Sequence, residues 1–166
     1  MKDSPDLSEV GSRISPDYLQ RFIANPLKVQ PGIMMPDMLV GHSPEKRKDI
    51  AEAIAHFLTG RSSRPFSEIG VDQGNFSTGR KLFHDIGCVA CHSPRDEREN
   101  EVEVQGLSSL AHVKEKYSQV SLTKFLFDPH LARPSGRMPD MKLSKDESSD
   151  LAAYLIGNKV PSIKPL

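Results

Sequence analysis

Cysteine and histidine residues in one short segment, Cys88-Val89-Ala90-Cys91-His92, constrain this chain more than any other feature. The chain contains only two cysteines, and both fall in this segment. A Cys-x-x-Cys-His segment is typical of covalent haem attachment, in which each thiol forms a thioether with one vinyl group. The imidazole that follows is a good axial ligand for the iron. The segment therefore predicts a haem c bound by Cys88 and Cys91, with His92 as a metal ligand.

Two other interpretations of the same segment stay open from its residues alone. A redox-active cysteine pair is expected near a βαβ pattern, and no strand-rich stretch surrounds Cys88. A structural zinc site needs four ligands. Cys88, Cys91 and His92 supply three, and no second cysteine and histidine cluster follows at a suitable spacing.

Composition limits the other classes of function. The chain of 166 residues is long enough for one ordinary domain or two very small ones. Its apolar fraction of 37% is low, and a buried porphyrin would add apolar surface to a small core. Lys and Arg together number 22, as do Asp and Glu, so nothing favours nucleic acid or an anionic membrane surface.

Neither a transmembrane span nor a secretory signal peptide is indicated. No apolar run reaches the roughly 18 residues that a spanning helix needs. The segment from Met1 to Val10 is polar and contains Pro5. Because haem c is attached outside the cytoplasm, we expect a periplasmic or other extracytoplasmic location. We also expect the sequence to be a mature or excised segment with Met1 added.

Helical patterns dominate, and the predicted fold class is all-α. Helices are expected over residues 16–24, 44–60, 78–86, 121–128 and 145–156, most of them after a serine N-cap. Pro129 is expected to stop the fourth. The second carries an apolar stripe of Ile50, Ala53, Ile54, Phe57 and Leu58. Residues 61–74 are expected to be a linker, and the charged run 95–103 a solvated loop.

The chain repeats itself at a constant separation of 103 residues. Residues 18–38 and 121–141 share 8 identities in 21 positions, at Leu19, Phe22, Pro26, Pro31, Met35, Pro36, Asp37 and Met38 of the first copy. This pattern predicts an ancestral duplication. The second copy has its Cys-x-x-Cys-His segment 46 residues before Met138, and the first copy has none. We therefore expect a degenerate or truncated unit over 1–60 and a whole domain over 75–166.

Residues 75–160 resemble a small class I c-type cytochrome. The resemblance rests on Gly79-Arg80-Lys81-Leu82-Phe83, on residues 87–92 and 125–129, on Arg137-Met138-Pro139 and on residues 151–155. It implies a cytochrome c fold around one covalent haem, with His92 as proximal and Met138 as distal ligand. Thioether sulfur would raise the reduction potential relative to a second histidine. Residues 5–60 resemble the later half of the same family.

Other residues compete for these roles. Met141 is the rival of Met138, and His130 is a candidate for a bis-histidine site. His84 and His112 are expected to be surface or hydrogen-bonded histidines. Met35 and Met38 are expected to be packing or partly exposed residues, although a lost upstream attachment segment would make Met35 the ligand of a second haem. The family commonly has Gly-Pro where Gly106-Leu107-Ser108 stands, which leaves open the carbonyl that orients His92.

Electron transfer is the function that these features favour, since two protein ligands leave the iron no open position for a substrate. The expected partners are redox proteins that meet the exposed haem edge, and the chain is an electron carrier rather than an enzyme. A larger redox protein could contain it. The alternative is a peroxidase-like or ligand-sensing haem domain with a displaceable methionine. Residues 1–60 must cover their apolar helices, either on residues 75–160 or in a homodimer.

Overall fold

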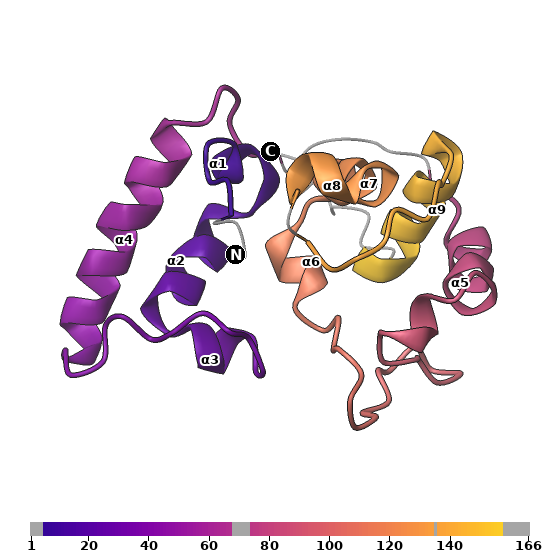
Figure 1. Cartoon of the computed structure of the whole chain (residues 1–166), viewed down its shortest axis with the longest axis horizontal. Helices are drawn as coiled ribbons and strands as arrows, with labels where there is room; N and C mark the ends of the chain where they lie inside the picture. Colours follow the sequence, from indigo (N-terminus) through magenta and orange to yellow (C-terminus); the bar gives the residue numbers. More distant parts are fainter. Residues whose placement is uncertain (1–4, 68–73, 135, 158–166) are drawn as a thin grey trace, which may run out of the picture.

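The computed structural model describes residues 5–67, 74–134 and 136–157. Within these ranges the chain folds into nine α-helices and one short 3-10 helix, η1, with no strand (Figure 1). The elements are α1 (Val10–Arg13), α2 (Pro16–Ala24), α3 (Pro26–Val29), α4 (Pro44–Gly60), α5 (Phe76–Asp85), η1 (Cys88–Ala90), α6 (Val113–Lys116), α7 (Gln119–Phe127), α8 (Pro129–Ala132) and α9 (Lys145–Ile156). The predicted all-α class is confirmed. None of the helices in the described part is long and apolar enough to span a membrane.

Polar side chains set most helix starts. Ser15, Ser43 and Ser144 cap α2, α4 and α9 as predicted. The cap of α5 differs from the prediction, because the Asn75 side chain accepts a hydrogen bond from the Thr78 amide at 3.0 Å and Ser77 lies inside the helix. Likewise, α7 starts at Gln119 after Ser118, which forms a capping box with Ser121.

Four short helices, α1, α3, α6 and α8, are absent from the sequence prediction, and two of them begin at a proline. As expected, α7 ends before Pro129, and the same proline also begins α8. Asp128 ends α7 with its backbone and starts α8 with its side chain, which accepts from the Leu131 amide at 2.9 Å. Asn25 does the same between α2 and α3. A proline is well suited to the first turn of each new helix, where its missing N–H has no intrahelical partner.

The helices form two neighbouring groups with separate apolar clusters. In Figure 1, α1 to α4 lie on one side and α5 to α9 on the other. The larger cluster belongs to the second group and consists of Phe83, Val113, Leu122, Leu126, Leu143, Leu151, Ala152, Tyr154 and Leu155. The smaller cluster comprises Val10, Leu19 and Ala55. The bounds of α1, α2 and α3 each lie 103 residues before those of α6, α7 and α8.

The face that α4 buries differs from the predicted apolar stripe. Ala51 and Ala55 are buried, whereas Phe57 is 63% exposed and Ile54 is 38% exposed. The small alanine side chains allow α2 to approach α4 closely, and Ala55 packs with Leu19. Within this chain, Ile54 and Phe57 of the predicted stripe therefore lie outside the buried face of α4.

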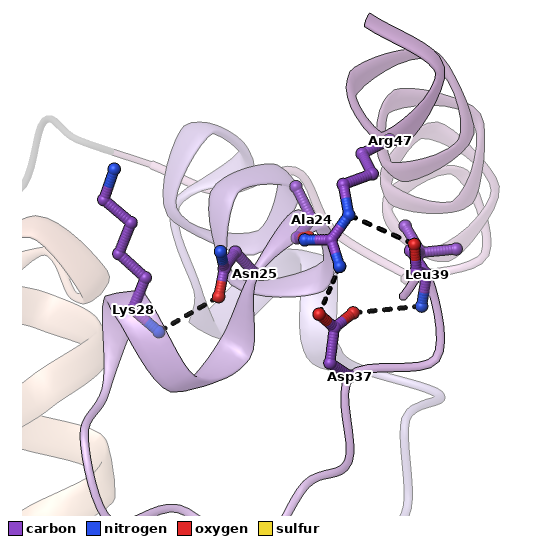
Figure 2. Close-up of polar contacts among 6 residues, drawn as sticks. All are labelled: Ala24, Asn25, Lys28, Asp37, Leu39 and Arg47. Atoms are coloured by element: carbon purple, nitrogen blue, oxygen red, sulfur yellow. Dashed lines mark hydrogen bonds and ion pairs between the residues drawn. The ribbon is translucent and has the colours of Figure 1, made fainter. Parts of the chain in front are cut away.

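Arg47 fastens α4 to the segments around it (Figure 2). Its Nε donates to the Leu39 carbonyl at 3.1 Å, and its Nη1 donates to the Ala24 carbonyl at 2.9 Å. Its Nη2 pairs with the Asp37 carboxylate, which also accepts from the Leu39 amide at 3.0 Å. One partly buried guanidinium thus joins the end of α2, the segment after Met35 and the first turn of α4.

The first group of helices packs on the second. The Ser15 amide donates to the Lys116 carbonyl at 2.8 Å, and Arg21 pairs with Glu115 at 2.9 Å. This is one of the two arrangements that the sequence predicts for residues 1–60. The predicted linker lies partly outside the described residues; within its described part, Ser62 accepts a hydrogen bond from the Gly11 amide.

Candidate haem attachment site

The two cysteines lie in a tight turn after α5. Gly87 ends the helix with a φ of 94°, which glycine adopts without strain. Cys88 to Ala90 then form η1, and the His92 amide donates to the Cys88 carbonyl at 3.0 Å. Both thiols are free; Cys91 is exposed and Cys88 is half-buried, which raises the pKa of its thiol. The turn therefore presents two unpaired thiols on one compact piece of backbone.

The His92 side chain is oriented by the backbone of a distant segment. Its Nδ1 lies 3.3 Å from the Ser108 carbonyl oxygen. Backbone hydrogen bonds fix the same two segments, because Ser93 donates to Ser108 at 3.2 Å and Ser108 donates to Cys91 at 2.9 Å. An Nδ1–H that donates to this carbonyl leaves Nε2 with its lone pair for a metal. The orienting carbonyl, left open by the sequence, is thus that of Ser108, the equivalent of Pro5 in the first copy.

Met138 and the cysteine turn contact the same apolar cluster. Cys88, Val89 and Met138 are all partly buried against the core that contains Phe83 and Leu126. Met138 follows α8, and His130 on that helix has its Nε2 3.1 Å from the Met138 carbonyl oxygen. The attachment turn and the methionine segment are far apart in the sequence, and the fold brings both to one apolar core.

Met141 also packs against this cluster, so both candidate methionines lie beside the core. Its equivalent in the first copy, Met38, is 75% exposed, and Met34 is 76% exposed. Met35 is half-buried. His84 is exposed on α5 with its ring edge against Phe83. His112 is partly buried and stacks on Tyr18, with ring centroids 6.2 Å apart.

Close contact between α5 and α9 holds the attachment turn in place. A Cβ atom on Gly79 would lie 1.9 Å from the Asp150 carbonyl oxygen, so only glycine allows this approach. Phe83 and Tyr154 pack across the same crossing with ring centroids 5.5 Å apart. Burial, reinforced by the neighbouring Glu99 carboxylate, raises the pKa of Tyr154 to about 12.

Arg95 is a positioning residue that the sequence analysis missed. Its guanidinium lies 4.8 Å from the centroid of the Tyr154 ring. It donates to the Tyr154 carbonyl at 3.1 Å and to the Leu155 carbonyl at 3.0 Å, which satisfies the last turn of α9. The expectation of a solvated charged loop is therefore wrong at Arg95, although Asp96, Glu97 and Arg98 are exposed.

The residues of this site suit haem c. They provide two free thiols, an imidazole whose Nδ1 faces a backbone carbonyl, and a thioether beside an apolar core. Nitrogen and sulfur are the axial ligand types found in cytochromes c. Across the described ranges, no three His, Cys, Asp or Glu side chains come together as a metal site of another kind.

Comparison with protein families supports this chemistry. The cytochrome c family matches residues 76–158, which include the cysteine pair. No curated protein and no solved structure matches the chain. A cytochrome c domain implies covalent haem c and electron transfer based on it. Through this half of its length, the chain belongs to the cytochrome c family.

Proposed function

We propose that this chain carries electrons through one haem c, with thioether bonds at Cys88 and Cys91, His92 as proximal ligand and Met138 as distal ligand. The observation that carries the proposal is the arrangement of His92, whose Nδ1 faces the Ser108 carbonyl oxygen at 3.3 Å directly after the cysteine turn. When bound, haem supplies an iron that takes up and releases one electron.

The protein holds the attachment turn and the methionine segment beside one apolar core. Gly79 allows α5 to pack closely on α9, and Arg95 joins the segment after His92 to the end of α9. The methionine segment is held at the same core by Met138 itself and by the contact of its carbonyl with His130. Filled axial positions leave the chain no site for a substrate, which supports a carrier rather than an enzyme. Partner redox proteins would then meet the exposed side of the turn at Cys91.

We propose further that residues 1–60 are a degenerate cytochrome c unit without its own haem, that residues 61–74 link it to the domain at 75–166, and that one haem is bound per chain. The bounds of α1, α2 and α3 match those of α6, α7 and α8 at a separation of 103 residues, which supports a degenerate second unit. Attachment of haem c outside the cytoplasm supports an extracytoplasmic location, where a larger redox protein could contain this chain.

Spectroscopy of the protein produced in a host that matures cytochromes c tests the proposal. We expect covalent haem at one per chain by pyridine haemochrome and mass. The ferric protein should show the near-infrared band of iron–methionine coordination, and the ferrous protein should not bind carbon monoxide readily. Cys88→Ser with Cys91→Ser should remove the covalent haem. A high-spin ferric spectrum with ready carbon monoxide binding would favour a ligand-binding domain instead.

A further inference from the structure

Helix α9 is covered on two sides, whereas α4 is covered on one. α9 packs against α6 and α7 and also against α5. α4 packs against α1 and α2, the counterparts of α6 and α7 in the repeat, and no described helix takes the place of α5. In Figure 1, α4 accordingly lies at the outer edge of the molecule, with α2 on its inner side. The side of α4 that corresponds to the α5 side of α9 is therefore uncovered within the described ranges.

Serine caps align α4 and α9 residue by residue. Ser43 and Ser144 each accept a hydrogen bond from the amide three residues later, so the two helices correspond at a separation of 101 residues. Ala51 and Ala152, which this separation pairs, are both fully buried. The separation is shorter than 103 because the first copy has two more residues in the segment before its cap.

The crossing of α5 and α9 shows what this side of the helix binds. The Asp150 carboxylate accepts a hydrogen bond from the Asn75 amide at the start of α5. A Cβ atom on Gly79 would lie 1.9 Å from the Asp150 carbonyl oxygen and 2.9 Å from the Tyr154 Cβ atom. Phe83, one turn later, packs on the Tyr154 ring. The covering helix thus has a free amide at its start, a glycine at the crossing and an aromatic ring one turn further on.

Matching features occupy exposed positions on α4. Asp49 corresponds to Asp150, and its carboxylate takes part in no ion pair among the residues that the structure describes. Ala53, one turn after Asp49, takes the place of the tyrosine and is small enough to allow a close crossing. Ile54 and Phe57 add exposed apolar surface beside it. A face that combines a free acceptor with exposed apolar side chains is typical of an interaction site.

Charges around this face argue against a second copy of α4 as the covering helix. Lys46, seven residues before Ala53, lies at one end of the face. Arg61, whose guanidinium is 5.6 Å from the Phe57 ring centroid, lies at the other end. Antiparallel pairing of two α4 helices about Ala53 would bring Lys46 of one copy close to Arg61 of the other, and like charges repel. The two cations instead favour a partner helix with acidic side chains beside its apolar face.

We propose that the face of α4 formed by Asp49, Ala53, Ile54 and Phe57 binds an amphipathic helix of a partner protein. The partner helix has the chemistry of α5 at the crossing, namely a glycine followed by an aromatic residue one turn later, together with acidic side chains on its flank. The inference rests on the proposed assignment of residues 1–60 as a degenerate unit. It gives that unit a role in docking a partner, in addition to its packing on the haem domain.

A synthetic peptide of residues 74–87, which spans α5 and contains no cysteine, tests the inference by calorimetric titration of the full-length protein with its haem. We expect saturable binding, which Asp49→Ala and Phe57→Ser should each weaken on the order of tenfold, because they remove the acceptor and the apolar contact. A peptide with Gly79→Leu should not bind, since its side chain would meet the backbone of α4. A peptide with Arg80→Glu should bind more tightly, because it adds an acidic group opposite the two cations.

Glu52→Ala is the matched control. Glu52 also lies on α4, but its carboxylate accepts from the Gln20 side chain of α2 at 3.5 Å, on the other side of the helix. This variant should bind the peptide as the wild type does. Equal binding by Asp49→Ala, Phe57→Ser and the wild type, or no saturable binding up to about 1 mM peptide, would overturn the inference.

Sedimentation of the wild type distinguishes a second copy from a partner protein. We expect a monomer, and a dimer that Phe57→Ser dissociates would overturn the inference, because a second copy would then cover the face. Haem content is measured separately on the same samples. A chain that binds the peptide but carries no covalent haem would contradict the proposed function alone, whereas a chain with one haem that ignores the peptide would contradict the inference alone.

Discussion

The Ser108 carbonyl oxygen lies 3.3 Å from Nδ1 of His92, sixteen residues away in the chain. This contact orients the His92 ring beside the cysteine turn and engages its Nδ1 atom. The geometry depends on the backbone of Ser108 rather than on its side chain, because the Ser108 amide and carbonyl both bond to residues of the turn. A proline at this position would supply the same carbonyl but would lose the hydrogen bond to Cys91.

Substituting each methionine in turn distinguishes the two candidate ligands. Met138→Ala should abolish the near-infrared iron–methionine band and lower the reduction potential, because alanine supplies no soft ligand. Met141→Ala should keep the band, although Met141 is also partly buried against the core and is therefore a matched control. Loss of the band in Met141→Ala, with its retention in Met138→Ala, would reverse the assignment.

His130 should hold the methionine segment in place through its contact with the Met138 carbonyl at 3.1 Å. His130→Leu introduces the residue found at the equivalent position of the first copy, Leu27, and removes this hydrogen bond. Loss of a hydrogen bond worth about 1 kcal/mol predicts that added imidazole displaces the methionine roughly fivefold faster. His130→Gln should keep the wild-type rate, and His84→Leu, at an exposed position of α5, should not change it. An unaltered rate in His130→Leu would contradict this role.

Gly79 should be indispensable for the crossing of α5 and α9. Gly79→Ala places a methyl group 1.9 Å from the Asp150 carbonyl oxygen, so the two helices must separate. We expect a loss of about 3 kcal/mol in the free energy of unfolding, measured with a chemical denaturant. Gly60→Ala is the control, because nothing lies within 4 Å of the added methyl group. That change should stabilise the protein by up to about 1 kcal/mol.

Arg47 should provide the main polar contacts that stabilise the first group of helices. Arg47→Met removes its hydrogen bonds to Leu39, Ala24 and Asp37 and leaves two carbonyls and a carboxylate without this donor. The expected loss is on the order of 3 kcal/mol, with faster proteolysis between residues 30 and 43. Arg61→Met removes an exposed guanidinium that packs over Phe57 and should change stability by less than about 0.5 kcal/mol. Equal losses in the two variants would contradict the role of Arg47.

His112 should make the protein less stable in mild acid. Burial lowers its pKa to about 4 in the folded state, below its ordinary value of 6.5. Between these values the unfolded chain binds a proton at this residue and the folded chain does not, so stability falls as the pH drops from about 6.5 to about 4. The effect should be on the order of 2 kcal/mol. His112→Phe keeps a ring against Tyr18 and should flatten this part of the pH profile, whereas His84→Phe should not.

Local sequence signals predicted much of the fold. Serine caps located the starts of α2, α4 and α9, since the cap and its amide partner lie three residues apart. The sequence predictions were wrong where contacts with distant segments determine which residue caps a helix or lies in the core. Ser77 has the chemistry of a cap, but Asn75 takes that role beside Asp150 of α9. Phe57 has the hydrophobicity of a core residue, but α2 packs against the alanines of α4 instead.

The sequence by itself determined the attachment chemistry and the helical class of this protein, because thiol spacing, the adjacent imidazole and the caps are all relations between near neighbours. Tertiary structure decided which carbonyl orients His92 and how Arg95 satisfies the end of α9. These relations join residues that lie far apart in the chain, and only the packing of helices brings such residues within reach of one another.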